Sequence, residues 1–311
     1  MRTVLIGNPG AGRKAGLPTN TGTVDDAIAA LHAVGVQPEV WLTRGPADPP
    51  AFARRAVAEG YELVIAAGGD GTVEEVARGL VGTPVTLGVM PLGSVMNLAR
   101  TLGIPRDLRE AARLIADGRL LCMDVGEANG HYFLEYAGVG LDAALYPLTQ
   151  QLDRGQWTSL RDLLRVALRY RPMKVTISVD GEVQTLPALL VVVANTPYFG
   201  PAVELTPEAK VDDARLDVKV FDRFTLLELV RYGFQILRGQ RPHHPRVRQF
   251  RGRTIAIASS RPLPAHADIQ SIGTTPVSFR VVPRALHVIA NPTLWEGMDS
   301  SPVSRAAPAV A

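Results

Sequence analysis

The stretch AAGGDGTVEEVARGL, residues 66–80, joins an apolar run to a helical pattern through a turn that contains three glycines. Glycines in such close succession would weaken either a strand or a helix, so they indicate a turn where bare backbone approaches a neighbour. Asp70 and Thr72 add a carboxylate and a hydroxyl to this turn. The stretch therefore predicts a strand, a glycine turn and a helix in succession.

Outward from this turn, the chain up to Asp124 alternates strand patterns with helix patterns. The expected strands lie at 2–8, 38–43, 62–69 and 86–93, and the expected helices at 23–35, 48–60, 72–82, 95–104 and 108–118. Alternation of this kind indicates a parallel sheet covered by helices. Ligands of such sheets collect at the carboxyl ends of the strands.

Beyond Asp124 the pattern changes to short strands separated by Gly, Pro, Asp and Asn, with helical stretches near 157–170 and 225–238. The expected strands lie at 131–140, 173–182, 188–195, 214–221, 253–259 and 277–283. This half is expected to form an antiparallel sandwich or barrel. The predicted organisation is an α/β domain with a parallel sheet at 1–124, rejoined by about 286–295, a β-rich antiparallel sandwich domain at 125–285, and a disordered tail at 296–311.

The composition is that of a soluble globular protein, with 46% hydrophobic residues, 20% charged residues and a net charge of +3. A single cysteine, Cys122, excludes an internal disulfide framework and fits a reducing compartment. The longest apolar run, 186–194, is interrupted by Pro187 and is far shorter than the roughly 20 residues of a membrane helix. The N-terminal apolar stretch is too short for a signal peptide, so we expect a cytoplasmic protein.

Three expected strand ends carry glycine turns: GNPGAG at 7–12, GGDGT at 68–72 and PLGS at 91–94. A parallel sheet brings all three turns to one edge. Glycine lets backbone N–H groups approach a phosphate, and the N-terminus of a following helix favours negative charge. Because a carboxylate suits Mg²⁺ better than phosphate alone, Asp70 indicates a nucleotide–metal site. The alternative is a set of tight turns with N-caps, and neither of the two familiar glycine-rich phosphate motifs is present.

These stretches together resemble a known family. The chain is similar to the diacylglycerol kinase catalytic family in five stretches. Those of the first half are NPGAG, GGDGTVEEVARGL and MPLGSVMNLARTLGIP, and those of the second half are VVVANTPYFGPAVELTPEAKVDDARLDV and IGTTPVSFRVVPRAL. The resemblance covers roughly residues 2–292 in order. The family includes bacterial lipid kinases and sphingosine kinases, and it is similar to NAD kinases in its GGDG turn. The resemblance implies an ATP-dependent lipid kinase, whose ATP lies between an α/β domain and a β-rich lipid-binding domain.

The resemblance also implies which residues contact ATP. The expected contacts are Asn8, Pro9, Gly10, Ala11, Gly12, Thr43, Gly68, Gly69, Asp70, Gly71, Thr72, Val73, Glu74 and Ser94. Glu74 lies at the margin of this set, and Ser94 stands where the family usually has threonine. Taken alone, Thr43 is an ordinary residue at the end of a strand.

A second implied site is a Mg²⁺ site in the stretch KVDDARLDV. The resemblance assigns the side chain of Asp213 and the backbone oxygens of Lys210 and Arg215 as ligands, and oxygen ligands suit this hard cation. Ala214 replaces the family's usual glycine, which predicts a strained or reshaped loop if that position needs a positive φ. The alternative is a solvated acidic turn.

The chain departs from the family at 268–270, where the usual Asp-Gly-Glu reads Asp268, Ile269 and Gln270. Transfer of phosphate to a lipid hydroxyl benefits from a carboxylate that accepts the proton, and the family places this acceptor in the triplet, commonly on the glutamate. An amide cannot take this role, which leaves Asp268 as the expected base. A second departure puts Met96 and Asn97 where the family has Asn-Asp.

Three interpretations stay open. Asp268 carries catalysis, with Asp70 acting at the nucleotide. Alternatively, the acceptor differs from diacylglycerol and uses altered base chemistry. In the third, the chain binds nucleotide or lipid with weak or no transfer. A competing enzyme class, NAD kinase, shares the GGDG turn but lacks support from the two stretches of the second half.

The expected partner is a lipid substrate presented by a membrane surface. Residues 157–174 place Arg161, Arg165 and Arg169 at a spacing of four beside an apolar face, and 237–253 hold six further arginines. Such segments favour contact with anionic lipid at the inner membrane face, and the alternative is a helix packed on its own core with a solvated basic face. A nucleic acid partner is not favoured, and a homodimer stays open.

Overall fold

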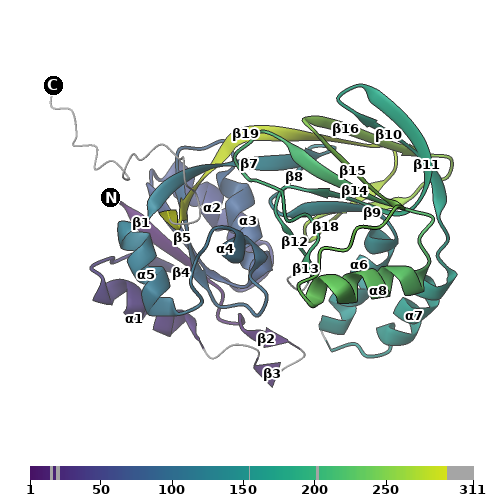
Figure 1. Cartoon of the computed structure of the whole chain (residues 1–311). Coiled ribbons are helices and arrows are strands. Elements are labelled where there is room, and N and C mark those ends of the chain that lie inside the picture. The colour runs from purple at the N-terminus through teal and green to yellow at the C-terminus, as the bar shows by residue number, and fades with distance from the viewer. Residues whose placement is uncertain (15–16, 19–21, 154, 201–202, 293–311) are drawn as a thin grey trace. The chain divides into compact units, whose positions relative to one another are not determined.

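The computed structural model describes residues 1–14, 17–18, 22–153, 155–200 and 203–292, and the tail expected at 296–311 lies outside these residues (Figure 1). Internal contacts divide the chain into two compact units. Unit 1 comprises Met1–Arg13, Pro18–Met123 and the chain from Arg284 onward, and unit 2 comprises Lys14–Leu17 and Asp124–Pro283. The chain passes between them within two long strands, β7 (Arg119–Ala128) and β19 (Val277–Ala290).

Unit 1 is built on a parallel sheet with the strand order β19-β6-β5-β1-β4. Its other strands are β1 (Thr3–Gly7), β4 (Glu39–Leu42), β5 (Leu63–Gly68) and β6 (Thr86–Pro91). Strands β5 and β6 are buried along their whole length, as expected for continuous apolar runs with helices on both faces. Gly7 pairs with Ala67 and Gly68 pairs with Pro91, so three neighbouring strands end at the same level.

Two of the five helices described in unit 1 begin at a residue whose side chain caps them. The five helices are α1 (Val24–Ala33), α2 (Asp48–Ala58), α3 (Asp70–Leu80), α4 (Asn97–Thr101) and α5 (Leu108–Asp117). Thr23 and Asp26 form a capping box on α1, and Asp107 caps α5. Helices α2 and α3 pack closely because Gly79 faces Ala53, where a Cβ on Gly79 would lie 2.5 Å from the alanine Cβ.

Unit 2 is mainly antiparallel and follows the strand order β18-β17-β9-β11-β10-β16-β19. Strand β14 pairs with β11 and with β15, and β7 pairs with β8. The strands are β8 (His131–Phe133), β9 (Tyr136–Gly140), β10 (Met173–Val179), β11 (Glu182–Ala194), β14 (Leu216–Asp222), β15 (Val247–Gly252), β16 (Thr254–Ser259), β17 (Pro264–Ala267) and β18 (Gln270–Thr274). Two short pairs, β2 (Arg13–Lys14) with β3 (Leu17–Pro18) and β12 (Tyr198–Phe199) with β13 (Val203–Glu204), stand apart from this sheet.

Three helices belong to unit 2: α6 (Leu141–Asp153), α7 (Ser159–Arg169) and α8 (Leu226–Leu237). One apolar core lies within the curved sheet and includes Phe133, Val191 and Phe279. A second core includes Leu141 of α6, Phe221 of β14 and Tyr232 of α8. Alternating residues of β11 and β14 divide between these two cores, which is the period-two pattern of a strand buried on both faces.

The structure confirms the expected fold class, a parallel α/β part followed by an antiparallel β-rich part. It adds elements that the sequence patterns did not predict, namely α6, β7, β15 and the hairpin of β17 and β18. Within the described part of the chain, no helix combines the length and the apolar character that crossing a bilayer requires.

Candidate functional site

The first and second glycine turns are joined by the side chain of Asn8. This residue follows β1, and its amide Nδ2 donates to the hydroxyl Oγ1 of Thr72 at 3.0 Å. Its Oδ1 accepts the N–H of Gly10 at 2.9 Å, which folds the 8–12 turn back on itself, and its own N–H donates to the carbonyl of Ala67. Asn8 therefore fixes the Thr72 hydroxyl and the backbone of its own turn in one arrangement.

Glycine is required both inside the second turn and where the third turn meets it. A Cβ on Gly68 would lie 2.5 Å from Cβ of Thr72, and a Cβ on Gly93 would lie 2.7 Å from Cα of Gly69. The N–H of Leu92 donates to the carbonyl of Gly68 at 2.9 Å and holds the two turns together. The expected convergence of the glycine turns is confirmed, and its cause is backbone contact that side chains would prevent.

Asp70 connects the second turn to the start of α4. Its carboxylate accepts the N–H of Met96 at 2.9 Å and the N–H of Asn97 at 2.8 Å. Met96 has a φ of 56°, an uncommon conformation for a residue with a side chain, and it aims both N–H groups at the carboxylate. A carboxylate offers about four lone-pair directions, so two remain for a cation or a bridging water.

Other residues expected to contact ATP lie around the same strand ends. Thr43 follows β4 and donates its N–H to the carbonyl of Gly7 at 2.8 Å. Arg106 binds the carbonyl of Gly93 at 2.9 Å and that of Ser94, which ties the third turn to the chain that follows it. Glu74 is buried on α3 and forms an ion pair with Arg78 at 3.3 Å, a structural role. The role of all these residues as nucleotide contacts stays a prediction. The same holds for the other expected contacts, which include Pro9, Gly10, Ala11, Gly12, Gly71 and Val73.

The loop expected to bind Mg²⁺ is arranged around Asp124. This buried carboxylate accepts the N–H of Ala214 at 2.5 Å, and Ala214 has a φ of 56°, the positive value that the replaced glycine would favour. Asp213 accepts the N–H of Arg215 at 3.1 Å through one oxygen and forms an ion pair with Arg251 through the other.

A cation at Asp213 would meet the Arg251 guanidinium, so this donor set does not fit Mg²⁺ as arranged. Among the described residues, no group of three or more His, Cys, Asp or Glu side chains gathers as metal ligands. The site at Lys210, Asp213 and Arg215 stays a prediction that requires Arg251 to move.

Asp268, the expected base, is engaged by three backbone donors. One oxygen accepts the N–H of Leu134 at 2.7 Å, and the other accepts those of Glu135 at 3.0 Å and Tyr136 at 3.2 Å. Asp268 has a φ of 45° and is 5% exposed, and Gln270 begins β18 beyond it. The carboxylate thus anchors the hairpin of β17 and β18 to the segment before β9, and its role as base stays a prediction.

Sequence reasoning missed a buried pair next to this triplet. Nε2 of His266 on β17 lies 2.6 Å from Oδ2 of Asp142 at the start of α6, and Nδ1 lies 2.9 Å from the carbonyl of Asp268. The two residues are separated by 124 positions, so no local spacing could have predicted their contact. The sequence offered one clue to this site, because His266 lies two residues before the triplet 268–270 that differs from the family's usual residues.

Comparison with known proteins agrees with the fold. Residues 2–128 match the diacylglycerol kinase catalytic domain, and residues 136–290 match the YegS C-terminal NAD kinase beta sandwich-like domain. Two proteins named diacylglycerol kinase, from Staphylococcus aureus strains JH9 and Newman, are each 30% identical to this chain over 297 residues. These matches cover 93% of this chain and 92% of each relative. A crystal structure of a diacylglycerol kinase from Bacillus anthracis is 25% identical, with a TM-score of 0.73, and covers 94% of this chain and 98% of that one.

The fold and the two matches place the chain among proteins that join a diacylglycerol kinase catalytic domain to a NAD kinase beta sandwich-like domain. The chain belongs to the diacylglycerol kinase family.

Proposed function

We propose that this chain is an ATP-dependent lipid kinase that transfers the γ-phosphate of ATP to the hydroxyl of diacylglycerol or a related lipid. The observation that carries the proposal is the junction at the start of α3, where Asn8, Thr72 and Asp70 tie three glycine turns together. Relatives named diacylglycerol kinase support a lipid as the acceptor.

The chain's own groups suit the phosphates of ATP. The first N–H groups of a helix have no intrahelical partner, so the backbone at Asp70 and Gly71 is suited to an anion at the N-terminus of α3. The Thr72 hydroxyl accepts from Asn8 and can therefore direct its own hydrogen toward a phosphate oxygen. Positioning and charge stabilisation of this kind are the main means by which proteins accelerate phosphoryl transfer.

Mg²⁺ bound with the nucleotide would neutralise charge on the transferring phosphate. Asp70 is the carboxylate of the second turn, and oxygen ligands are those that this ion prefers. We assign Asp70 to hold the ion directly or through water, while its two hydrogen bonds to the start of α4 keep the carboxylate in place.

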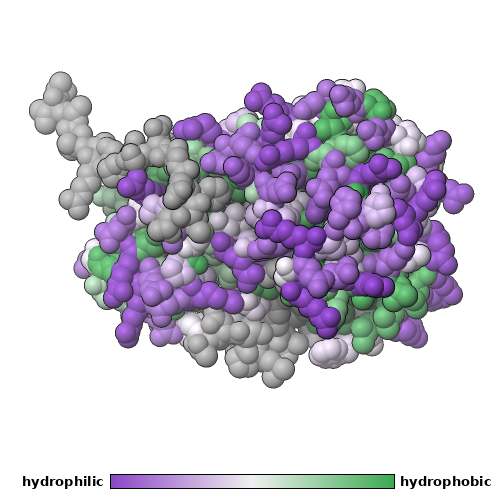
Figure 2. Space-filling model, viewed as in Figure 1, coloured by the Kyte–Doolittle hydropathy of each residue, from purple (hydrophilic) through white to green (hydrophobic). Residues whose placement is uncertain are grey.

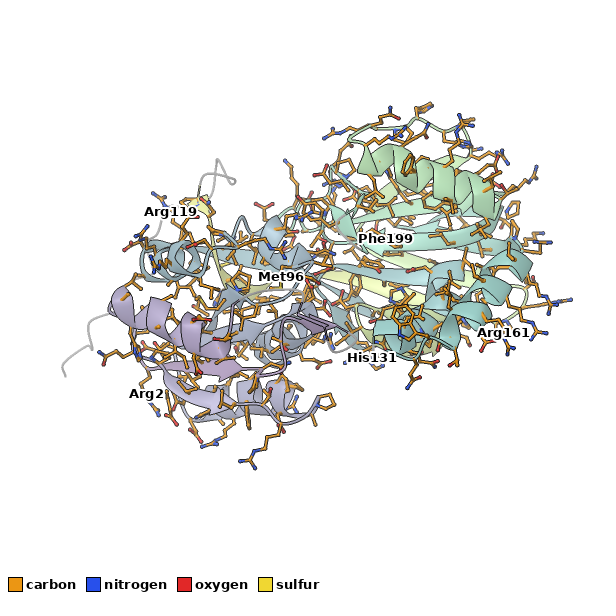
Figure 3. All side chains as sticks on the ribbon, turned by 90° about the horizontal axis from the view of Figure 1, so that it is seen from below. Arg2, Met96, Arg119, His131, Arg161 and Phe199 are labelled. Carbon is orange, nitrogen blue, oxygen red and sulfur yellow. The ribbon has the colours of Figure 1, made fainter. Side chains whose placement is uncertain are left out.

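Access to the lipid is assigned to two helices of unit 2. Helix α7 exposes Leu160, Leu164 and Leu168 with Trp157 just before it, and α8 exposes Leu227, Val230, Phe234 and Leu237; these side chains are between 46% and 78% exposed. Figure 2 shows apolar side chains gathered over the region of these helices, and Figure 3 shows Arg161 pointing away from α7 into solvent. An apolar helix face beside arginines suits an anionic bilayer surface, which we propose as the partner.

The arginines of the second basic stretch, 237–253, are less free to contact lipid than the sequence indicated. Arg246 forms an ion pair with Glu228, and Arg251 pairs with Asp213 and Asp217. Part of the stretch is strand β15, which pairs with β14. Contact with lipid through this stretch stays a prediction, and α8 is the better supported element. A cytoplasmic enzyme that binds the inner membrane face is consistent with this proposal.

The test is to incubate the chain with ATP labelled in its γ-phosphate, Mg²⁺, NAD and micelles of mixed lipid that include diacylglycerol. Label is expected in lipid, and chelation of Mg²⁺ with EDTA is expected to stop the transfer. Label in NADP would show an NAD kinase instead. Nucleotide binding without transfer to any acceptor would contradict the proposal and indicate a pseudokinase.

A further inference from the structure

A cavity of about 160 Å³ lies in unit 2 and is bounded by helix α8, strand β14 and the chain around Thr206. Helix α8 lies beside β13, from which that part of the chain continues (Figure 1). Tyr232 and Ile236 of α8 form one wall, and Val218 and Lys219 of β14 form another. Every lining residue belongs to unit 2, so this unit forms the cavity by itself.

The most deeply buried charge in this cavity is the ammonium group of Lys219. Because side chains alternate along a strand, Lys219 shares a face of β14 with Phe221, whose ring contacts Tyr232 of α8. Lys219 is 7% exposed, and its Nζ donates a hydrogen bond to the carbonyl of Leu205. Among the described residues no other atom accepts a hydrogen from this ammonium, which has three to donate. Buried donors without an acceptor cost free energy, so the cavity favours a ligand that brings anionic oxygens.

Charges of both signs line the cavity around this ammonium. Arg241, in the chain that follows α8, has no hydrogen bond or ion pair through its side chain within the described part of the chain. The same is true of the carboxylates of Glu204 and Glu208. A third carboxylate, that of Asp217, forms an ion pair with Arg251 at 3.5 Å. With that pair satisfied, two cationic and two anionic side chains are left, and a ligand that matches them carries one group of each sign.

The orientation of α8 indicates that the ligand comes from water. Successive residues of an α-helix are about 100° apart around its axis, so Val230 and Phe234 lie on the side opposite Tyr232 and Ile236. Val230 is 61% exposed and Phe234 is 52% exposed, whereas Tyr232 and Ile236 line the cavity. A phospholipid that contacts the exposed side of α8 would have the whole helix between its headgroup and the cavity.

We propose that this cavity binds a small water-soluble zwitterion, a primary amine that also carries a phosphate or a carboxylate. The anionic group of the ligand contacts Lys219 and Arg241, and its ammonium contacts Glu204 and Glu208. Hydrogen bonds between charged partners are the strong ones, and here each end of the ligand finds two. Binding of this ligand requires no phosphate transfer, so it can be measured whether or not the chain is a kinase.

The first arm of the test needs no variant. Phosphoethanolamine is titrated into the full chain in a calorimeter, beside β-alanine, which has a carboxylate in place of the phosphate. A Kd of about 0.1–1 mM is expected for at least one of them, and no heat from either at about 10 mM overturns the proposal. Methyl phosphate and ethanolamine each supply one half of the ligand and are expected to bind at least about tenfold more weakly. Equal affinity for either half overturns the assignment of a zwitterion.

The second arm places the ligand with matched variants. Arg241→Gln and Lys219→Met are each expected to weaken binding at least about tenfold, because each removes a cation that contacts the anionic group. Arg261→Gln is the control, since Arg261 is exposed and does not line the cavity. It is expected to bind as the wild type does. An Arg241→Gln variant that keeps the affinity of the wild type overturns the proposed site.

The third arm observes Lys219 in the wild type and holds even if Lys219→Met does not fold. The chain has four lysines, and ¹³C labelling at their Cε atoms gives a signal for each. Burial lowers the pKa of Lys219, against the charges of Glu208 and Asp217, so its signal is recognised by titration. The zwitterion that binds is expected to shift this signal and to leave the other three in place. Binding that does not move it overturns the proposal, and so does a shift caused only by vesicles that contain phosphatidylethanolamine.

Discussion

At the scale of single residues, the nucleotide site depends on positions where a side chain is absent. Gly68 leaves room for Thr72 within the second turn, Gly93 lets the third turn touch the second, and Asn8 and Asp70 then fix the turns with hydrogen bonds. The glycines could be recognised in the sequence because three of them so close together would weaken any helix or strand that contained them. The partners of Asp70 could not, because Met96 and Asn97 donate through backbone groups that any residue except proline carries.

Gly68→Ala is expected to lower the free energy of unfolding of the chain by about 1–3 kcal/mol, because the new Cβ would overlap Thr72. The same shift moves the hydroxyl that Asn8 holds, so affinity for an ATP analogue is expected to fall as well. Urea denaturation and calorimetric titration measure the two effects.

The matched control is Gly45→Ala, where an added Cβ meets nothing within 4 Å. This change is expected to alter stability by no more than about 0.5 kcal/mol. Equal effects of the two substitutions would show that the close contact with Thr72 is not what selects glycine at position 68.

At the scale of elements, helices could be predicted where apolar residues recur at a regular spacing, and elements without such a regular pattern were missed. Helices α7 and α8 were expected at nearly their observed bounds because apolar residues recur at helical spacing. Helix α6 was missed because it follows β9 directly and contains Pro147, and β15 was missed because its arginines resemble a basic loop. The pair of His266 and Asp142 depends on both β17 and α6, so it could not be predicted without them.

The apolar faces of α7 and α8 lead to a prediction about membrane binding. Leu164→Ser and Phe234→Ser each remove a large exposed apolar side chain, and binding to anionic vesicles is expected to weaken about tenfold for each. Flotation with vesicles that contain increasing phosphatidylglycerol measures this binding.

Val183→Ser provides the control, since Val183 is 64% exposed but lies on strand β11. It is expected to leave vesicle binding unchanged. Binding by the wild type that depends neither on anionic lipid nor on salt would contradict the proposed membrane surface.

At the scale of the whole molecule, the protonation of His266 links stability to pH. Its pKa is raised in the folded chain relative to its ordinary value of about 6.5. A group of this kind contributes stability in full below its unfolded pKa and loses it as pH rises through the folded pKa. The free energy of unfolding is therefore expected to decline on the alkaline side of about pH 6.5 by an amount that His266→Asn abolishes.

Denaturation of both proteins at a series of pH values gives this difference directly. Groups that His266→Asn leaves untouched contribute equally to both curves, so subtraction isolates the imidazole. A difference that grows toward high pH would mean that the folded chain lowers the pKa of His266, opposite to the sign expected from its contact with Asp142.

The bare Cα of Gly138, which pairs with His266 between β9 and β17, has a consequence for substitution at three positions. A side chain at this position would meet both His266 and Asp142, so Gly138 cannot be exchanged while these two residues keep their places. A larger residue at position 138 would therefore require smaller residues at positions 142 and 266 at the same time.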